Sequence, residues 1–206
     1  MRYVPITMLM AFASCGSVEL PREQYWRLDL PATAASELPQ KGVLRVADLQ
    51  LGNSLSGDCL VVAAGPSMLE TRDYDRWVAP LDRLVTDAFV LGLGRTRLWA
   101  LVKSASDGGT EDYTLNGRIV DFCEQAATAT QPRTARAAFS FWVENREGLV
   151  FADEFRTEVA IHESGPAGTV QALSQAVQQI VDEVAGRMRV ATVMQESANA
   201  EPPAGR

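Results

Sequence analysis

The sequence of 206 residues lacks the patterns that mark the common enzymes and nucleotide-binding proteins. It has one histidine, three cysteines and no Cys-x-x-Cys pair, so the spacing of the usual zinc and dithiol redox sites is missing. It contains neither the Gly-x-Ser-x-Gly turn that presents a serine nucleophile nor the Gly-x-x-x-x-Gly-Lys-Ser/Thr loop that holds nucleotide phosphates. We therefore expect no catalytic centre, no metal site and no cofactor.

Long apolar runs and basic clusters are missing as well. No apolar run approaches the about 20 residues that cross a bilayer as a helix. Lysine and arginine never gather with interleaved aromatics and the net charge is −7, so the chain would repel a phosphate backbone and no nucleic-acid partner is expected. What is present, 47% hydrophobic and 22% charged residues, is typical of one globular domain with tails.

The remaining candidates for chemistry are weak. His162 lies beside Glu163 at the end of a predicted strand, where a lone histidine is usually a surface residue. Acidic pairs such as Asp73 and Asp75 stand beside turns, where carboxylates are ordinarily solvated. A periplasmic hydrolase is therefore a disfavoured alternative.

The N-terminus has the layout of a secretory signal. A positive start precedes a short apolar run, and the run ends in the sequence Phe12-Ala13-Ser14-Cys15. This pattern resembles a bacterial lipobox, in which the cysteine sulfur accepts a diacylglyceryl group and the chain is cleaved before the cysteine. Each buried CH₂ of the acyl chains then contributes about 0.8 kcal/mol to anchoring. Because Phe12 replaces the usual leucine, an ordinary cleaved signal or a short buried segment, with Cys15 incidental, stays open.

Hydrophobic periodicity divides the rest of the chain into strands and two helices. Alternating or continuous apolar runs predict strands over 25–30, 43–51, 59–64, 68–74, 97–104, 113–124, 135–143 and 149–161. Helical spacing predicts amphipathic helices over 75–91 and 170–188. The resulting class is α+β, a mixed, mostly antiparallel sheet with both helices packed on one face.

These patterns also give the boundaries of the chain's parts. Residues 1–14 are predicted to be a lipoprotein signal peptide and 15–24 a tether, followed by one α/β domain over 25–192. Residues 193–206 lack apolar periodicity and include Pro202-Pro203, so we predict a disordered tail.

The four tryptophans divide into two groups. Trp77 and Trp99 fall on the apolar faces of a predicted helix and a predicted strand, which favours the core. Trp26 and Trp142 lie near a strand start and a hairpin, where each is either a core residue or a half-exposed interface anchor.

Two cysteines follow the lipobox. Cys59 and Cys123 form a disulfide if their Cα atoms come within about 7 Å in an oxidising compartment. The other interpretation is two buried thiols, which the apolar strands around them slightly favour.

The order of elements and several motifs resemble the ABC-type transport auxiliary lipoproteins, a PqiC/YmbA-like family. The motifs are the lipobox, Tyr25-Trp26-Arg27-Leu28, Arg76-Trp77-Val78-Ala79-Pro80-Leu81, the strand from Tyr113 to Phe122 and the closing helix. The likeness covers nearly the whole mature chain. It departs from the family at Phe12 and at Val78-Ala79, where Ala-Glu is usual.

The resemblance implies a non-enzymatic docking or bridging lipoprotein on the periplasmic side of the outer membrane. Such proteins work with an ABC permease and ATPase and an MCE-domain protein in moving lipids between the inner and outer membranes, and some form homo-oligomers. Gly16 after Cys15 is compatible with export to the outer membrane. The family offers no catalytic residue, so Cys15 is the one functional position it implies. A lipoprotein that binds and activates a cell-wall synthase is the alternative of another class.

Overall fold

The computed structural model describes residues 22–32, 42–53, 55 and 57–200, with the backbone alone for 192–200. The predicted signal peptide, Cys15 and most of the predicted tether lie outside the described residues.

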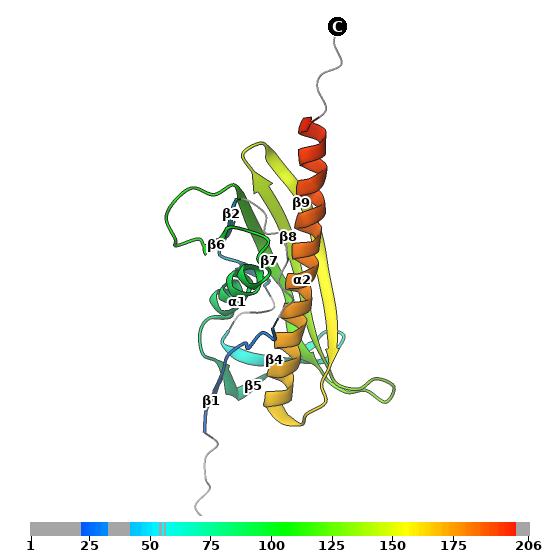
Figure 1. Cartoon of the computed structure of the whole chain (residues 1–206). Helices are drawn as coiled ribbons and strands as arrows, with labels where there is room; N and C mark the ends of the chain where they lie inside the picture. The colour runs from blue at the N-terminus through cyan, green and yellow to red at the C-terminus, as the bar shows by residue number, and fades with distance from the viewer. Residues whose placement is uncertain (1–21, 33–41, 54, 56, 201–206) are drawn as a thin grey trace, which may run out of the picture.

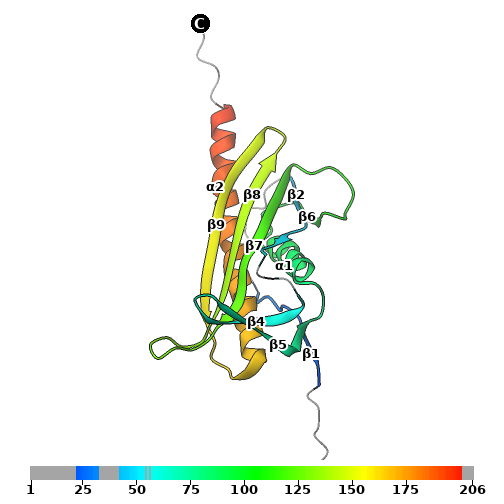
Figure 2. The same ribbon diagram turned by 180° about the vertical axis from the view of Figure 1, so that it is seen from behind.

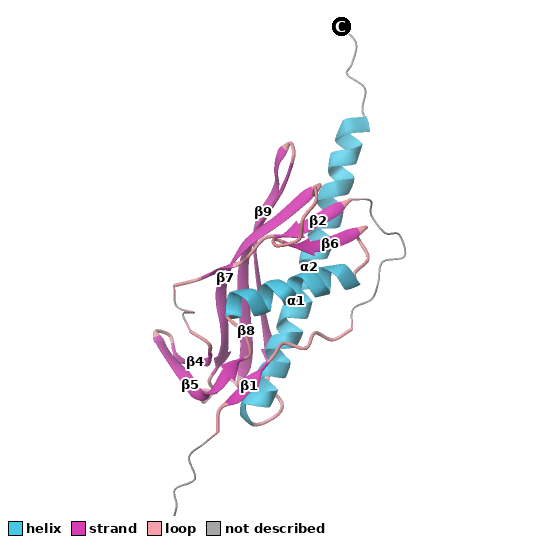
Figure 3. Cartoon of the chain, turned by 90° about the vertical axis from the view of Figure 1, so that its left-hand side faces the viewer, coloured by secondary structure: helices cyan, strands magenta, loops and turns pink. Residues whose placement is uncertain are grey.

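The described residues form one mixed sheet and two helices, which confirms the predicted α+β class (Figures 1 and 3). The strands are β1 (Gln24–Trp26), β2 (Val43–Val46), β3 (Gln50–Leu51), β4 (Cys59–Gly65), β5 (Met68–Trp77), β6 (Leu101–Ser104), β7 (Tyr113–Gln125), β8 (Thr134–Asn145) and β9 (Gly148–Ala160). The helices are α1 (Leu81–Arg95) and α2 (Gly165–Ala200).

Strand β7 is the centre of the sheet. On one side it pairs antiparallel with β8, which pairs antiparallel with β9, and these are the longest strands. On its other side β7 pairs parallel with β2, β3 and β4 at successive positions along its length. Strand β6 extends the sheet beyond β2, while β5 and then β1 extend it beyond β4. The short strand β1 is therefore an edge strand.

Both helices pack on the same side of the sheet, and Figure 2 shows the reverse side of β7, β8 and β9 uncovered by them. Phe89 of α1 contacts Phe139 and Phe141 of β8, with ring centroids 5.2 and 4.9 Å apart. A Cβ on Gly92 would lie 3.0 Å from the methyl carbons of Val181, so glycine at this position lets α1 cross α2 closely. Burial of these aromatic rings stabilises the fold.

The predicted helix start at residue 75 is wrong. Residues 75–77 end β5, and α1 begins at Leu81 directly after Pro80. Trp77 is buried at the end of a strand, not on a helix, because β5 continues by pairing with β1. Trp99 is buried as expected, although it precedes β6 rather than lying within it.

Helix α2 is longer than the periodicity indicated. It begins at Gly165 with Pro166 in its first turn, where a missing N–H costs least, and it runs to Ala200. Residues 193–200, predicted as part of a disordered tail, continue the helix, because alanine, methionine, glutamine and glutamate favour a helix without an apolar stripe. No helix of the described residues combines the length and apolarity needed to cross a bilayer.

Candidate functional site at the start of the folded domain

Two of the sequence motifs meet where the described chain begins. Strand β1 pairs parallel with β5, so that Tyr25 is opposite Arg76 and Trp26 is opposite Trp77. The backbone N–H of Val78 donates to the Trp26 carbonyl at 2.8 Å and extends this pairing past the end of β5. The segment that leads from Cys15 therefore enters the domain as an added edge strand.

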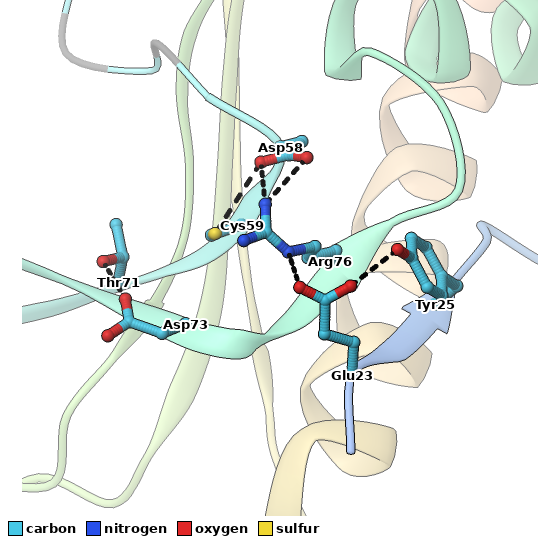
Figure 4. A network of polar contacts seen from close by, with 7 residues as sticks. All are labelled: Glu23, Tyr25, Asp58, Cys59, Thr71, Asp73 and Arg76. Carbon is cyan, nitrogen blue, oxygen red and sulfur yellow. Dashed lines mark hydrogen bonds and ion pairs between the residues drawn. The ribbon is translucent and has the colours of Figure 1, made fainter. Parts of the chain in front are cut away.

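Four side chains fasten this strand to its neighbours (Figure 4). The guanidinium of Arg76 donates to both carboxylate oxygens of Asp58, at 2.8 and 3.0 Å, and to Glu23 at 3.1 Å. Tyr25 donates its hydroxyl hydrogen to the other oxygen of Glu23 at 2.7 Å. The planar fork of arginine suits two acceptors at once. We call Glu23, Tyr25, Asp58 and Arg76 the tether clip.

The charges of the tether clip reinforce one another. The hydrogen bond from Arg76 holds the pKa of Asp58 below its ordinary value, and the same bond raises the pKa of Arg76. The hydrogen bond to Glu23 raises the pKa of Tyr25. Near neutral pH the carboxylate of Asp58 therefore stays ionised beside the guanidinium of Arg76. The members of the tether clip are solvent-exposed, so the clip fixes the position of β1 without contributing much to global stability.

Trp26 adds a second attachment. Its indole N–H donates to Asp75 at 3.0 Å, and the half-buried ring packs against the core. The ring thus anchors its own strand, and its use as an interface anchor stays a prediction.

The segment after β1 is held by both helices. The backbone N–H of Asp29 donates to the Ser174 hydroxyl of α2 at 3.1 Å. Arg95 of α1 donates to the Leu30 carbonyl at 3.0 Å, and the Leu30 side chain is buried. The chain is therefore attached to the helical layer within a few residues of the clip.

A buried ion cluster fixes β5 to the rest of the molecule. Glu124 of β7 is only 3% exposed and accepts hydrogen bonds from Arg133 at 2.7 Å, Arg72 of β5 at 2.9 Å and Thr169 of α2 at 2.6 Å. Burial would raise the pKa of Glu124, but the hydrogen bonds from Arg133 and Thr169 outweigh it and hold the pKa below its ordinary value. The carboxylate stays ionised and joins β5, β7 and α2, so the strand that carries Arg76 cannot shift freely.

The uncovered side of the sheet is a second candidate surface. Because side chains alternate along β8, Phe141 points to the helices and Trp142 to the open side, where Trp142 is half-buried. It borders a shallow hollow of about 580 Å³, lined by Gly52, Asn53, Arg118, Val120, Ser140 and Trp142. The role of Trp142 as an interface anchor stays a prediction.

Three of the residues weighed for chemistry are Cys59, Cys123 and His162. Cys59 and Cys123 are free thiols, Cys59 partly exposed and Cys123 buried. Cys123 donates to Asp121 at 3.1 Å, and burial raises the pKa of its thiol to about 12. His162 is exposed in the turn between β9 and α2, as its place in the sequence predicted.

No local sequence pattern indicates the Glu124 cluster or the contact between Arg76 and Asp58. Arg72 and Arg133 lie 52 and 9 residues from Glu124, and Thr169 lies 45 residues away, with no spacing that marks a motif. Arg76 was singled out only as part of a motif, and a local pattern cannot name its partners.

The sequence matches one family model. Residues 27–185 match the family described as ABC-type transport auxiliary lipoprotein component. None of the curated proteins matches the sequence.

Similar folds occur among solved structures. A Xanthomonas campestris protein of family DUF330 shares 17% identity, with a TM-score of 0.73 over 84% of this chain and 99% of that protein. An uncharacterised protein shares 18% identity, with a TM-score of 0.66 over 81% of this chain and 99% of its own. A hypothetical protein of Chlamydia trachomatis shares 10%, with a TM-score of 0.50 over 72% and 95%. At these identities the likeness concerns the fold.

Proposed function

The chain belongs to the family of ABC-type transport auxiliary lipoprotein components, and on this premise we propose that it docks onto or bridges the parts of an MCE-associated lipid transport system between the inner and outer membranes. The observation that carries the proposal is the match over residues 27–185, which begins directly after β1 and ends within α2. In this role the chain is not an enzyme; it is the membrane-held adaptor of a permease, an ATPase and an MCE-domain protein.

Cys15 is the proposed lipid attachment site. Cleavage before Cys15 would leave the short segment 16–21 between the lipid and the first described residue. The tether clip supports this assignment, because any pulling force on a chain anchored through Cys15 acts first on β1. Hydrogen bonds from Arg76 to Glu23 and from Trp26 to Asp75 hold that strand to the sheet.

The outer membrane is the proposed location, on its periplasmic side. Gly16, and not aspartate, follows the proposed lipidated cysteine. The domain then faces the periplasm, where it can meet the MCE-domain protein. Trp142 and the hollow beside it offer one such contact, since half-exposed aromatic residues are frequent interface anchors.

Mass spectrometry and co-purification test the proposal together. The native chain, tagged at its C-terminus, is extracted from membranes in mild detergent, and its intact mass and bound proteins are determined. We expect acyl mass on Cys15 and co-purifying permease, ATPase and MCE-domain proteins. A Cys15→Ser variant should lack the acyl mass and leave the membrane fraction.

Two outcomes would contradict the proposal. A native chain without acyl mass, found free in the periplasmic extract, would remove the anchor. A lipidated chain that brings down a cell-wall synthase, and no transport component, would assign it to a different machine.

A further inference from the structure

Large hydrophobic side chains are unevenly exposed over the described surface. Five of the nine most exposed ones come from β1, from β5 and from the residue directly after β5: Tyr25, Met68, Leu69, Tyr74 and Val78. The other four are spread singly over α1, β6, β9 and α2. Single exposed hydrophobics are normal on a soluble domain, whereas a concentration of them marks a contact surface. We call these five residues the apolar edge.

The apolar edge lies at the end of the molecule where the chain enters the domain. Figures 1 and 2 both show β1 and β5 at the end of the domain opposite the turn between β8 and β9 and the last turns of α2. Tyr25 is the most exposed of the five, at 62%, and it also belongs to the tether clip.

The length of the tether limits how far this end can move from the anchor. Seven residue steps separate Cys15 from Arg22, and they span at most about 25 Å even when fully extended. Helix α2, with 36 residues, is about 54 Å long. The extended tether is thus about half as long as α2. Because the tether joins the domain at β1, the end with β1 and β5 stays near the anchoring bilayer, whereas the opposite end can lie farther from it.

We propose that the apolar edge contacts the surface of the lipid bilayer in which Cys15 is anchored, an inference that rests on the proposed lipidation. Tyrosine suits the headgroup region because its ring is apolar and its hydroxyl is polar. Met68, Leu69 and Val78 supply the aliphatic groups that enter the boundary between headgroups and acyl chains.

The charges near the apolar edge indicate which force holds it to the bilayer. Strand β5 carries three acidic and two basic residues, and both of the basic ones, Arg72 and Arg76, are already paired with carboxylates of this chain. Over residues 22–29 and β5 together, four basic side chains stand against five acidic ones, so there is no excess of positive charge to attract anionic lipid. The contact is therefore apolar, and it forms on zwitterionic membranes without help from low salt.

A fluorescent label tests the contact in the lipidated full-length chain. Cys59→Ser removes the accessible thiol, buried Cys123 stays in place, and a single new cysteine, Leu69→Cys or Leu149→Cys, carries an environment-sensitive dye. Leu149 is the matched control, because it is an exposed leucine, 63% against 48% for Leu69, at the opposite end of the domain. Each protein is reconstituted into phosphatidylcholine vesicles with and without doxyl-labelled lipid.

We expect the doxyl lipid to quench the dye at position 69 several-fold more than the dye at position 149, with the same result at 0.1 and 0.5 M salt. Equal quenching at the two positions, in chains that carry acyl mass and float with the vesicles, overturns this inference and leaves the proposed function standing. Quenching that disappears at high salt also overturns this inference, because the contact would then be electrostatic. The inference is overturned as well if, without vesicles, the dye at position 69 becomes shielded as protein concentration rises, because a second copy of the chain would then cover the edge. A chain without acyl mass overturns both proposals.

Discussion

The edge of the sheet at β1 and β5 and the part of the sheet under the helices are held together by different forces. At the edge, β1 is a three-residue strand secured by hydrogen bonds and by the exposed ion pairs of Arg76. Under the helices, β8 and β9 pair over their whole length, and the rings of Phe139 and Phe141 stack 5.4 Å apart in full burial. Exposed ion pairs respond to salt and to single charge changes, whereas buried apolar contacts set the global stability.

This division suits the anchored adaptor that we propose. The domain can stay folded while its entry strand is loosened, because the edge adds little to the core. The Glu124 cluster is the bridge between the two regions, since it joins β5 of the edge to β7 and α2. Substitutions in the edge, in the buried sheet or in the Glu124 cluster therefore test whether the two regions respond independently.

Removing a core ring should have the largest effect. Phe141→Ala is expected to lower the free energy of unfolding by about 3–5 kcal/mol, because it leaves a cavity between β8 and α1. The neighbouring Trp142→Ala, on the open side of the same strand, is the control, with an expected loss of about 1 kcal/mol. Chemical denaturation measures both. Equal losses would contradict the division into a buried core face and an open face.

Removing the buried carboxylate should have the next largest effect. Glu124→Gln leaves the guanidinium groups of Arg72 and Arg133 without their counter-charge. We expect a loss of about 2–3 kcal/mol at pH 7, at the low end for a buried pair because both arginines are partly solvated. Glu154→Gln, which breaks an exposed pair with Arg156, should cost far less.

The pH dependence of that loss has a fixed sign. The pKa of Glu124 is lower in the folded chain than its ordinary value of 4.5, so its contribution is fully present above about that pH. It disappears as the pH falls through the folded-state pKa. The difference in unfolding free energy between wild type and Glu124→Gln should therefore shrink below pH 4.5. A difference that stays constant down to pH 3 would show that the charge of Glu124 plays no part.

The sequence predicted elements whose signal is local and missed those that depend on distant partners. The strand over 135–143 and the helix over 170–188 carry their own periodicity, and both lie within β8 and α2. Trp77 continues the helical spacing of α1 by coincidence, so it was assigned to the helix. Its true place depends on pairing with Trp26, 51 residues earlier, and no local pattern reports such a pairing.

The same limit applies to the candidate site. Aromatic side chains and motifs drew attention to Trp26 and Arg76, but not to Asp58 or Glu23, which hold Arg76 in place. Acidic residues beside turns are common, and most are solvated. Only the fold shows that these two meet one guanidinium.

Opening the tether clip should loosen β1 with little effect on global unfolding. In Arg76→Gln we expect amide exchange at Val78, whose N–H is bonded to the Trp26 carbonyl, to become several-fold faster. Arg76→Lys should fall between this variant and wild type, because a lysine cannot supply the fork. Arg156→Gln, which breaks an exposed pair far from β1, is the control. Unchanged exchange at Val78 in Arg76→Gln would mean that backbone pairing alone holds the strand.

The smallest expected effect is a difference in reactivity between the two free thiols, of which one lies in each region. Cys59 begins β4 beside the clip and is partly exposed, whereas Cys123 is buried in β7 with its pKa raised to about 12. Burial thus keeps the Cys123 thiol largely protonated at pH 8, and the thiolate is the reactive form. A disulfide reagent should therefore modify Cys59 in the native domain and reach Cys123 only after denaturant is added. Cys59→Ser should abolish the native reaction; rapid modification that persists in this variant would place Cys123, and with it the end of β7, in contact with solvent.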